Sequence, residues 1–369
     1  MAPTQDALYA EIDLALSWSE RELPQRERTK HVHALHPYLG KFIPQLVEAL
    51  LERYVPRGGA VLDPFAGSGT TLVQALESGR DAGGADIAAF NVLLARVKTA
   101  DYNLFKLEHE LREALAAFEA GASPTAPAPA SRYLERWYAP RALGELLAFR
   151  ELVAPADHAD VLRIVLARAA RSARLTPHFD LDFPRAPQTQ PYWCHKHRRE
   201  CRPVQEAAHF LRRYALDTLA RIKAFARLRP RGREATVLHG DARTLDFGCR
   251  FDAVVTSPPY PGLIDYHEQH RYAYELLDLP DLGRLELGRG TSRHALADYV
   301  DGIAAVLANA ASQLRRGAPV LVVVNDRREL YPEILERAGL RLEERLRRHV
   351  NRRTGRRAGE FFEDILVAR

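Results

Sequence analysis

The side chains best suited to chemistry lie in the run Ser257-Pro258-Pro259-Tyr260, which follows a short apolar segment, 251–256. Two consecutive prolines cannot continue a central strand, so the chain should leave the sheet here, at the edge where ligands bind in open α/β folds. Prolines also hold the nearby carbonyl groups in one direction. The Ser257 hydroxyl and the Pro258 carbonyl can then accept both hydrogens of an amino group, while Tyr260 stacks on the ring that carries it. We therefore expect all four residues to be catalytic.

This geometry suits methylation of an amino group on a nucleic-acid base. The lone pair of such a nitrogen is delocalised into the ring, which makes the nitrogen a poor nucleophile. Accepting both N–H hydrogens localises the lone pair and prepares an in-line attack on a methyl donor, a step that needs positioning and electrostatics rather than a covalent intermediate. A base stacked in a duplex cannot reach the loop, so it must be flipped out. A plain Pro-Pro turn is the alternative.

A second segment, Asp63-Pro-Phe-Ala-Gly67-Ser-Gly69-Thr, has the pattern of a ligand-binding turn between a strand and a helix. Its glycines permit a tight turn and let a ligand touch the backbone. The segment lacks the lysine of a phosphate-binding loop, and Asp63 at the strand end would repel phosphate. A carboxylate can instead accept from an ammonium group. Since S-adenosylmethionine carries an ammonium group and no phosphate, we expect it to be the cofactor.

Two further acidic residues follow predicted strands. Asp86 ends the next strand, 23 residues after Asp63, where a carboxylate can accept from both ribose hydroxyls of a nucleoside. Asp241 follows the third strand and could accept from the adenine amino group. A helix-capping role is equally consistent with the position of Asp241.

These residues follow strands that alternate with helices, which is the pattern of a doubly wound α/β sheet. The predicted strands are 59–62, 82–87, 236–239, 252–256 and 320–325, and the predicted helices include 71–78 and 297–314. Segments 340–350 and 361–368 could close the sheet as an antiparallel pair around Arg352–Gly359. The predicted fold is a seven-stranded, mostly parallel, Rossmann-like α/β sheet with an antiparallel C-terminal hairpin and a mostly helical insertion between its second and third strands.

The insertion is predicted to begin in the Pro/Ala-rich segment Ala122–Ala130, which has the composition of a linker. The predicted domains are a catalytic domain, 1–121 plus 234–369, and the insertion, 122–233. Between Arg132 and Arg233 there are 21 Lys and Arg against 10 Asp and Glu, a balance of +11 within a chain of net charge +5. Such an excess suits a polyanion, although a solvated helical face is the alternative. We expect the insertion to recognise double-stranded DNA.

The densest cluster of aromatic and basic side chains in the insertion runs from Pro191 to Arg202. This mixture suits contacts to phosphates and base edges and wedging into an opened stack. The segment 265–272 follows the catalytic loop closely, and either a solvated helix or a wall facing the DNA fits its composition. The residues expected to contact DNA are Trp193, His195, Lys196, Arg198, Arg199, Arg202, Asp265 and Tyr266.

The same cluster contains two cysteines and two histidines within eight residues: Cys194, His195, His197 and Cys201. A zinc site is conceivable there, but the C-x-x-C and H-x3-H spacings of common zinc sites are absent. We therefore expect no bound metal. For the role of this cluster, a plain surface helix is the alternative to DNA contact.

The runs Asp63–Thr70 and Thr256–Tyr260 resemble the two diagnostic motifs of the amino-group DNA methyltransferases, which modify cytosine N4 or adenine N6. The Ser-Pro-Pro-Tyr form resembles the cytosine-N4 branch, since the adenine branch more often carries Asp first. His36–Phe42 resembles the motif that completes the family's cofactor pocket. The resemblance covers roughly residues 30–105 and 235–369, and the place of the insertion departs from the family's common chain orders. The implied cofactor-binding residues are Tyr38, Lys41, Phe42, Asp63, Phe65, Gly67, Ser68, Gly69, Thr70, Asp86, Ile87, Asp241 and Ala242.

The resulting hypothesis is a DNA methyltransferase that modifies the N4 amino group of a flipped cytosine at a specific site. Restriction–modification would then need a separately encoded endonuclease, because the chain shows no nuclease motif. Adenine-N6 methylation remains open. Methylation of a guanine amino group in RNA is less favoured, because no RNA-binding module is evident. A non-catalytic DNA-binding role on the same scaffold is disfavoured by the intact loop after residue 256.

Composition bears on the compartment. Three cysteines are too few for a disulfide framework and indicate a reducing environment. The first twenty residues lack the basic and apolar regions of a signal peptide. The longest apolar runs, such as Val320–Val324, have the length of a strand and are too short to span a bilayer. We expect a cytoplasmic protein.

Overall fold

The computed structural model of the chain describes residues 12–19, 21–38, 40, 42–121, 131–178, 180, 184–262, 265–350 and 361–369. Three features named in the sequence lie outside this part: Lys41, the linker Ala122–Ala130 and the turn Arg352–Gly359. The chain folds as two compact units. The first, the sheet unit, comprises Met1–Ala100, Leu228–Asp265 and Leu282–Arg369, and the second, the helical unit, comprises Asp101–Arg227 and Tyr266–Asp281.

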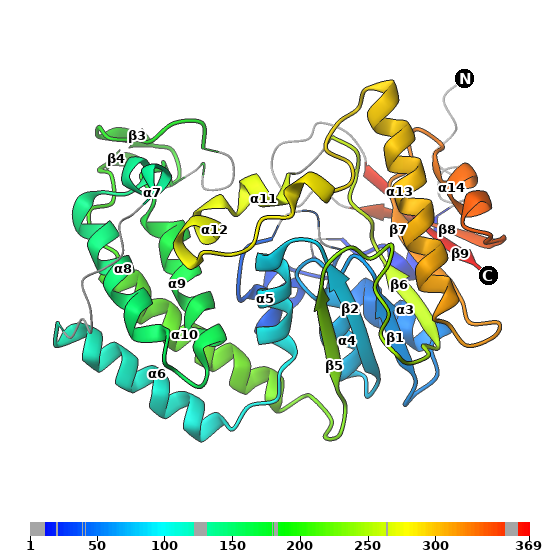
Figure 1. The fold of residues 1–369 in the computed structure, drawn as a ribbon, viewed down its shortest axis with the longest axis horizontal. Coiled ribbons are helices and arrows are strands. Elements are labelled where there is room, and N and C mark those ends of the chain that lie inside the picture. Colours follow the sequence, from blue (N-terminus) through cyan, green and yellow to red (C-terminus); the bar gives the residue numbers. More distant parts are fainter. Residues whose placement is uncertain are drawn as a thin grey trace. The chain divides into compact units, whose positions relative to one another are not determined.

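The sheet unit is built on a seven-stranded sheet with the strand order β5-β2-β1-β6-β7-β9-β8 (Figure 1). Its strands are β1 (Ala60–Asp63), β2 (Asp81–Asp86), β5 (Ala235–His239), β6 (Ala253–Thr256), β7 (Val320–Val324), β8 (Leu342–Val350) and β9 (Phe361–Ala368). The five strands from β5 to β7 in this order are mutually parallel, whereas β9 pairs antiparallel with both β7 and β8. The predicted mostly parallel sheet with an antiparallel C-terminal hairpin is confirmed.

The order of the strands reverses at β1. From β1 the chain moves outward through β2 to β5 and then returns to β6, on the other side of β1. In doubly wound sheets, such a reversal opens a crevice outside the carboxyl ends of the two central strands, and ligands bind there. Asp63 is the last residue of β1, and Ser257 follows the last residue of β6. The topology therefore brings the two predicted motifs to one edge of the sheet.

Helices cover both faces of the sheet: α3 (Pro44–Tyr54), α4 (Thr70–Glu77) and α5 (Ala89–Thr99) on one, and α13 (Arg293–Ser312) and α14 (Tyr331–Arg337) on the other. Successive side chains of a strand point to opposite faces. Accordingly, Val61 of β1 packs with the first group of helices and Leu62 with the second. Because helices cover both faces, every residue of β7 is buried.

The helical unit consists mainly of α6 (Leu104–Glu119), α7 (Arg132–Trp137), α8 (Pro140–Val153), α9 (Ala159–Ala173), α10 (Ala208–Ala226), α11 (Tyr266–Gln269) and α12 (Arg271–Leu277). Helix α9 is its centre and packs against α8, α10 and α12. This unit begins at Asp101 and so includes α6, which the predicted boundaries placed in the catalytic domain.

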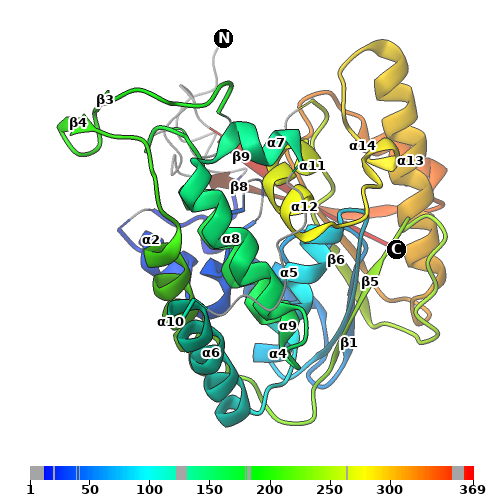
Figure 2. The ribbon, with the colours of Figure 1, turned by 60° about the vertical axis from the view of Figure 1, so that its left-hand side comes forward.

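The stretch Thr176–Pro203, which is rich in proline and aromatic residues, contains a small hairpin. Strands β3 (Tyr192–Cys194) and β4 (Arg199–Cys201) pair antiparallel, apart from the large sheet. Figure 2 shows the hairpin projecting beyond helices α8 and α10 of the same unit.

The remaining short elements are η1 (Leu14–Leu16), α2 (Gln25–Arg28), η2 (His31–Ala34) and η3 (Gly283–Leu285). Across the described ranges, no helix combines the length and the apolar character that crossing a lipid bilayer requires.

Candidate active site

The turn between β1 and α4 has a backbone that glycine alone adopts easily. Gly67 and Gly69 have φ angles of 49° and 76°, in the left-handed region. A Cβ on Gly67 would lie 2.9 Å from the Tyr38 hydroxyl oxygen, a distance that real Cβ atoms do not reach. The structure therefore brings together Tyr38 and the glycines, all of which are predicted to line one cofactor site. The bare backbone of the turn suits close approach of a ligand.

Asp86, at the end of β2, holds this turn in place. Its Oδ2 accepts a hydrogen bond from the Gly67 amide (2.8 Å), and its Oδ1 accepts from the Ala88 amide (2.8 Å). The Asn91 amide group also donates to Asp86 Oδ1 and to the Tyr38 hydroxyl, 3.1 Å in each case. Burial raises the pKa of Asp86 to about 6, although these hydrogen bonds oppose the shift. Asp86 is thus both a support of the turn and a carboxylate beside it.

Asp63, at the end of β1, is almost completely buried. Its Oδ1 accepts from the Phe65 amide (3.1 Å) and from the Thr256 hydroxyl (2.6 Å). The bond from Thr256 ties the end of β6 to the end of β1, so the first motif and the catalytic loop share a direct contact. Burial raises the pKa of Asp63 to about 6, and the nearby Asp86 carboxylate contributes in the same direction. Both carboxyl groups are therefore mostly charged at pH 7.

The two carboxylates and the glycine turn fit S-adenosylmethionine. A buried carboxylate gains from an ammonium partner, which removes the penalty of an isolated buried charge. Asp63 offers such an acceptor, and the lone pairs of Asp86 that the backbone leaves available suit ribose hydroxyls. At Gly67 the absence of a Cβ lets the Tyr38 hydroxyl approach the turn closely. A phosphate would instead meet two negative charges.

The Ser257–Tyr260 loop after β6, which the sequence predicts to be catalytic, is anchored by hydrogen bonds on both sides. The Ser257 hydroxyl donates to the Val323 carbonyl of β7 (2.9 Å), and the Tyr299 hydroxyl donates to the Pro259 carbonyl (2.9 Å). The Tyr260 ring packs against the core beneath α13. Burial raises the pKa of Tyr260 well above its usual value, so its phenol stays neutral at working pH. Because Ser257 gives its own hydrogen to Val323, its oxygen can accept hydrogen bonds, and the Tyr260 phenol is already one hydrogen-bond partner of the Ser257 side chain.

Several other predicted cofactor residues have structural partners. Phe42 lies in the hydrophobic core under α3, and Phe65 is half-buried against the core on the opposite face. The Ser68 carbonyl accepts from the buried Lys98 ammonium group at 2.6 Å. Thr70 is the buried first residue of α4.

In the turn after β5, Asp241 was expected to accept from the adenine amino group, but it already has a partner in the protein. Both carboxylate oxygens of Asp241 accept from the Arg243 guanidinium (2.6–2.9 Å), which lowers the pKa of Asp241. An adenine amino group would have to share these oxygens with Arg243. The backbone carbonyls of the neighbouring predicted residues are also occupied: Ile87 lies 3.1 Å from His239 Nε2, and Ala242 accepts from Asn309 (2.9 Å).

Three residues that the sequence did not single out hydrogen-bond to the predicted ones. Asn91 connects Asp86 to Tyr38, Thr256 connects Asp63 to the catalytic loop, and Tyr299 holds the Pro259 carbonyl. Thr256 could have been found, because it directly precedes the loop and is a polar residue at the end of a buried strand. The sequence contains no comparable signal for Tyr299, which lies 40 residues away on α13.

The residues expected to contact DNA fall into two groups. The side chains of Trp193, Lys196, Arg198 and Arg199 are exposed on the β3–β4 hairpin or its turn, and Trp193 is 58% exposed. His195 and Arg202 are exposed beside them. In the second group, Asp265 forms an ion pair with Arg289 (2.7 Å), and Tyr266 begins α11.

Similarity to known proteins identifies the kind of enzyme. Residues 10–96 match the family model of DNA methylases that act on N6 or N4 amino groups. The type II methyltransferase M.MjaII of Methanocaldococcus jannaschii is 35% identical over 430 aligned positions, which cover 93% of this chain and 81% of that protein. The chain belongs to the DNA methylase family. A second relative of this methyltransferase, the type II methyltransferase M.MvaI of Kocuria varians, is 24% identical over 67% of this chain and 58% of that protein.

Family membership confirms the predicted cofactor and the general reaction. This methyltransferase uses S-adenosylmethionine and methylates an amino group in DNA, and the family includes both the cytosine-N4 and the adenine-N6 branches. Among solved structures, TrmN of Thermus thermophilus aligns with 14% identity and a TM-score of 0.36 over 89% of this chain and 49% of that one.

Replacing Asp86 by alanine should weaken S-adenosylmethionine binding by about 1–3 kcal/mol, the usual effect of leaving buried polar groups unpaired. The Gly67 amide, which Asp86 now holds at 2.8 Å, would lose its acceptor together with the ribose hydroxyls. Isothermal titration calorimetry with the cofactor measures the change. Asp81→Ala is the matched control, because Asp81 lies at the opposite end of β2 and pairs with Arg233. Equal affinities in the wild type and Asp86→Ala would exclude this role.

Proposed function

We propose that this methyltransferase modifies the N4 amino group of a flipped cytosine at a specific duplex site, as the modification enzyme of a type II restriction–modification system. The observation that carries the proposal is the anchored Ser-Pro-Pro-Tyr loop beside Asp63, in which the Ser257 hydroxyl donates to Val323 and, besides its hydrogen bond with Tyr260, has a lone pair for an amino group. A neutral hydroxyl and a carbonyl suffice to accept both hydrogens of the cytosine amino group. The relatives M.MjaII and M.MvaI are both named type II methyltransferases, which supports the same biological role.

The roles we propose for the chain's residues follow from this arrangement. Bound S-adenosylmethionine supplies a methyl group on a sulfonium centre. Asp63 accepts from the ammonium group of the cofactor and Asp86 from its ribose hydroxyls, so that the methyl group is held at a fixed place. Ser257 and the Pro258 carbonyl accept the two amino hydrogens of the cytosine, and Tyr260 contacts the face of the flipped ring. The chain thus contributes orientation and electrostatic stabilisation rather than a covalent nucleophile.

We assign target recognition to the helical unit. Many of its basic residues have partners within the unit: Arg168 is buried against Asp217, for example, and Arg212 pairs with Glu119. These pairs reduce the positive charge available to a partner. The hairpin basics, Lys196, Arg198, Arg199 and Arg202, are exposed, and the ion pairs found among the described residues do not include them. An exposed tryptophan beside these basic side chains is suited to insert between the bases of an opened DNA stack.

The modified base distinguishes the two branches of the family. Duplex DNA treated with the enzyme and S-adenosylmethionine should contain N4-methylcytosine, because the loop carries Ser257 where the adenine branch more often carries Asp. Digestion to nucleosides followed by mass spectrometry identifies the product, and modification-sensitive sequencing gives its sequence context. The control is DNA incubated without cofactor. N6-methyladenine as the product would refute the cytosine assignment. An unmethylated substrate would refute both the cytosine-N4 and the adenine-N6 assignments.

Removing the hairpin charges should reduce the salt dependence of DNA binding. In Arg198→Ala/Arg199→Ala, the slope of log affinity against log salt concentration should fall by about 0.9 for each lost phosphate contact. Fluorescence anisotropy with labelled duplex DNA at several salt concentrations measures the slope. The matched control is Arg57→Ala/Arg316→Ala, which removes the same charge from exposed positions preceding β1 and β7, at the edge of the sheet opposite the active site. A slope identical to that of the wild type would mean that the hairpin does not touch phosphate.

A further inference from the structure

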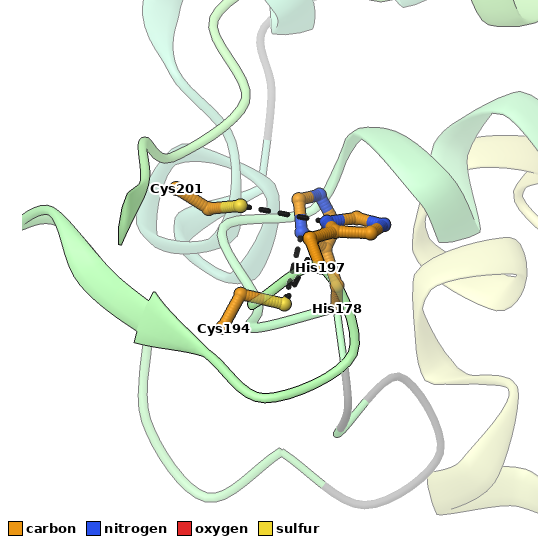
Figure 3. Close-up of side chains that lie close together, drawn as sticks. All are labelled: His178, Cys194, His197 and Cys201. Carbon is orange, nitrogen blue, oxygen red and sulfur yellow. Dashed lines mark hydrogen bonds between the residues drawn. The ribbon is translucent and has the colours of Figure 1, made fainter. Parts of the chain in front are cut away.

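Four potential metal ligands converge at the β3–β4 hairpin. They are His178, Cys194, His197 and Cys201, and their ligand atoms all lie within 4.8 Å of one another (Figure 3). Cys194 ends β3 and Cys201 ends β4, while His197 lies in the turn between the strands. His178 comes from the segment that precedes the hairpin, so the group joins two separate parts of the chain. Figure 3 shows all four side chains pointing toward one central region.

Three sulfur–nitrogen distances in the group are close to those within a tetrahedral zinc site. With Zn–S bonds of about 2.3 Å and Zn–N bonds of about 2.0–2.1 Å, a tetrahedral geometry separates a sulfur ligand from a nitrogen ligand by about 3.5–3.6 Å. Cys194 Sγ lies 3.8 Å from His178 Nδ1 and 3.6 Å from His197 Nδ1, and Cys201 Sγ lies 3.4 Å from His197 Nδ1. Two sulfurs and two imidazole nitrogens in tetrahedral arrangement form the ligand set that zinc prefers.

We propose that this Cys2His2 group binds one zinc ion and that the ion holds the hairpin in its folded form. The site is structural, because four protein ligands complete the tetrahedral coordination and leave no position for a substrate. No metal was expected from the sequence alone, and the proposed site replaces that expectation. The spacing in the hairpin is C-x2-H-x3-C, with a fourth ligand 16 residues before Cys194, and it differs from the common zinc-site spacings sought in the sequence.

The local structure explains why this hairpin needs a metal. Each strand has three residues, and a two-stranded hairpin of this size is marginal in water without further support. Its buried side chains are the two cysteines: Cys194 is fully buried and Cys201 is 6% exposed, whereas Trp193 and the residues of the turn are exposed. Apolar burial therefore gives the hairpin little stability. In modules of this kind, the free energy of metal binding contributes directly to folding.

The turn of the hairpin is shaped for coordination. The His197 amide donates to the Cys194 carbonyl (3.2 Å), and Arg198 has a φ of 51°, in the left-handed region. A non-glycine residue in this conformation is uncommon and is retained where the surroundings enforce it. The tight turn brings His197 back over the strands to face Cys194 and Cys201. Coordination by His197 gives this strained turn a physical reason.

A disulfide and an iron–sulfur cluster are the alternatives to zinc at this group. A disulfide between Cys194 and Cys201 would leave both histidines without a role, and both cysteines are free thiols in the structure. A two-iron cluster would need ligands on two metal ions, whereas all four ligand atoms lie within 4.8 Å of one another and suit a single ion. A mononuclear zinc site uses all four residues.

A bound ion would also fix the direction of the hairpin's exposed side chains. Trp193, Lys196, Arg198 and Arg199 lie beside or between the ligands in the chain. If the helical unit binds DNA as proposed above, zinc would hold these four residues in the arrangement that contacts the duplex. This consequence rests on the proposed function, but the metal site itself does not.

The metal content of the full chain tests the site directly. The protein, purified without chelators from zinc-supplemented medium, should contain about one zinc ion per chain by inductively coupled plasma mass spectrometry. Cys194→Ser, Cys201→Ser and His178→Asn should each lose most of it. The matched controls are Cys249→Ser and His195→Asn, since Cys249 is an exposed cysteine elsewhere and His195 is an exposed histidine adjacent to a ligand but outside the group. Both controls should keep the zinc.

A second measurement reports the ligand set. Cobalt(II) added to the metal-free protein should produce the visible absorption of a tetrahedral ion together with a thiolate-to-cobalt charge-transfer band. In Cys201→Ser the charge-transfer band should lose intensity. Hydrogen exchange in residues 184–202 should accelerate after chelation. Binding of S-adenosylmethionine by the sheet unit should persist, which separates loss of metal from general misfolding.

Three results would overturn the proposal: wild-type protein that takes up neither zinc nor cobalt, zinc content that is unchanged in Cys194→Ser, or a Cys194–Cys201 disulfide in freshly purified protein. None of these results would affect the proposed methylation, because the active-site residues lie in the sheet unit. Conversely, a protein that binds zinc at this site but leaves DNA unmodified would refute the proposed function alone.

Discussion

Replacing Ser257 by alanine should lower the rate of methyl transfer by roughly 10- to 1,000-fold, the scale observed when one oriented polar group is removed from a transition state. Ser257 donates to the Val323 carbonyl of β7, so its hydroxyl is fixed and its lone pairs have a defined direction. Alanine removes one of the two acceptors that we propose for the amino hydrogens. The nitrogen lone pair then stays delocalised into the ring, and its attack on the methyl group is slower.

Single-turnover methylation of a duplex containing the target site measures this effect. Cofactor affinity should be unchanged, because Ser257 contacts neither Asp63 nor Asp86 in the structure. Ser312→Ala is the matched control, since Ser312 is exposed at the end of α13 and its hydroxyl bonds only a local carbonyl. A full transfer rate in Ser257→Ala would show that the hydroxyl has no part in the chemistry. A reduced rate with equally weakened cofactor binding would indicate a structural role instead.

Much of the sheet could be predicted because its strands are short apolar runs that end in turn residues. Val320–Val324 is buried on both faces, which produces a continuous apolar run rather than an alternating one. The glycine turn after β1 was predictable for a related reason, since its backbone needs φ values that other residues avoid. The positions of Asp63 and Ser257 at one edge follow from the parallel pairing of β1 with β6.

The hydrogen-bond partners within the site could not be predicted, because they join residues far apart in the chain. Thr256 and Asp63 are separated by 193 residues, yet their side chains are 2.6 Å apart. The pairing of Asp241 with Arg243 is local, but the sequence equally permits a capping role or an adenine contact. Residue type and position indicate that a carboxylate lies at a strand end, whereas the donors that occupy its oxygens depend on side-chain packing.

The proposed metal group was missed for a similar reason. Sequence templates assume pairs of ligands with fixed spacing, and His178 lies well before the hairpin that carries the other three ligands. Only the folded chain brings it within 3.8 Å of Cys194. The neighbouring His195, which a count of cysteines and histidines would include, lies outside the group. Proximity in sequence therefore suggested His195, which lies outside the group, and did not suggest His178, which belongs to it.

Replacing Asp63 by asparagine should weaken S-adenosylmethionine binding roughly 10- to 100-fold at pH 7.5, since a hydrogen bond between charged groups contributes about 1.5–3 kcal/mol. Asparagine has nearly the same shape. Its carbonyl oxygen can take the place of Oδ1 and accept from the Phe65 amide and the Thr256 hydroxyl, as Asp63 does. The substitution thus removes the charge that would face the cofactor's ammonium group and preserves these two contacts, while its amide group must also accommodate the Thr71 hydroxyl, a further hydrogen-bond partner of Asp63.

The wild-type enzyme should also bind the cofactor less tightly in mild acid. The pKa of Asp63 is raised to about 6 by burial, so the carboxylate is largely protonated at pH 5 and no longer attracts an ammonium group. The dissociation constant should rise by up to about tenfold for each pH unit below 6 for this one group. Asp86, whose pKa is also raised to about 6, adds to the same trend. Calorimetric titrations from pH 5 to pH 7.5 should therefore show a weaker pH dependence in Asp63→Asn than in the wild type.

The stability of the cofactor-free protein gives the sharper test, because there the expected sign is reversed. A carboxyl whose pKa is higher in the folded state than in the unfolded state binds protons more tightly when folded. Its contribution to stability is therefore present at low pH and is lost as the pH rises from about 4 to about 6. At pH 7.5 the charged, buried Asp63 destabilises the free enzyme, and Asp63→Asn should raise the free energy of unfolding by about 1–3 kcal/mol. Thermal denaturation with and without S-adenosylmethionine should show a higher melting temperature in the free variant but a smaller increase on adding cofactor. A variant that is less stable in both states would mean that Asp63 serves the fold rather than the cofactor.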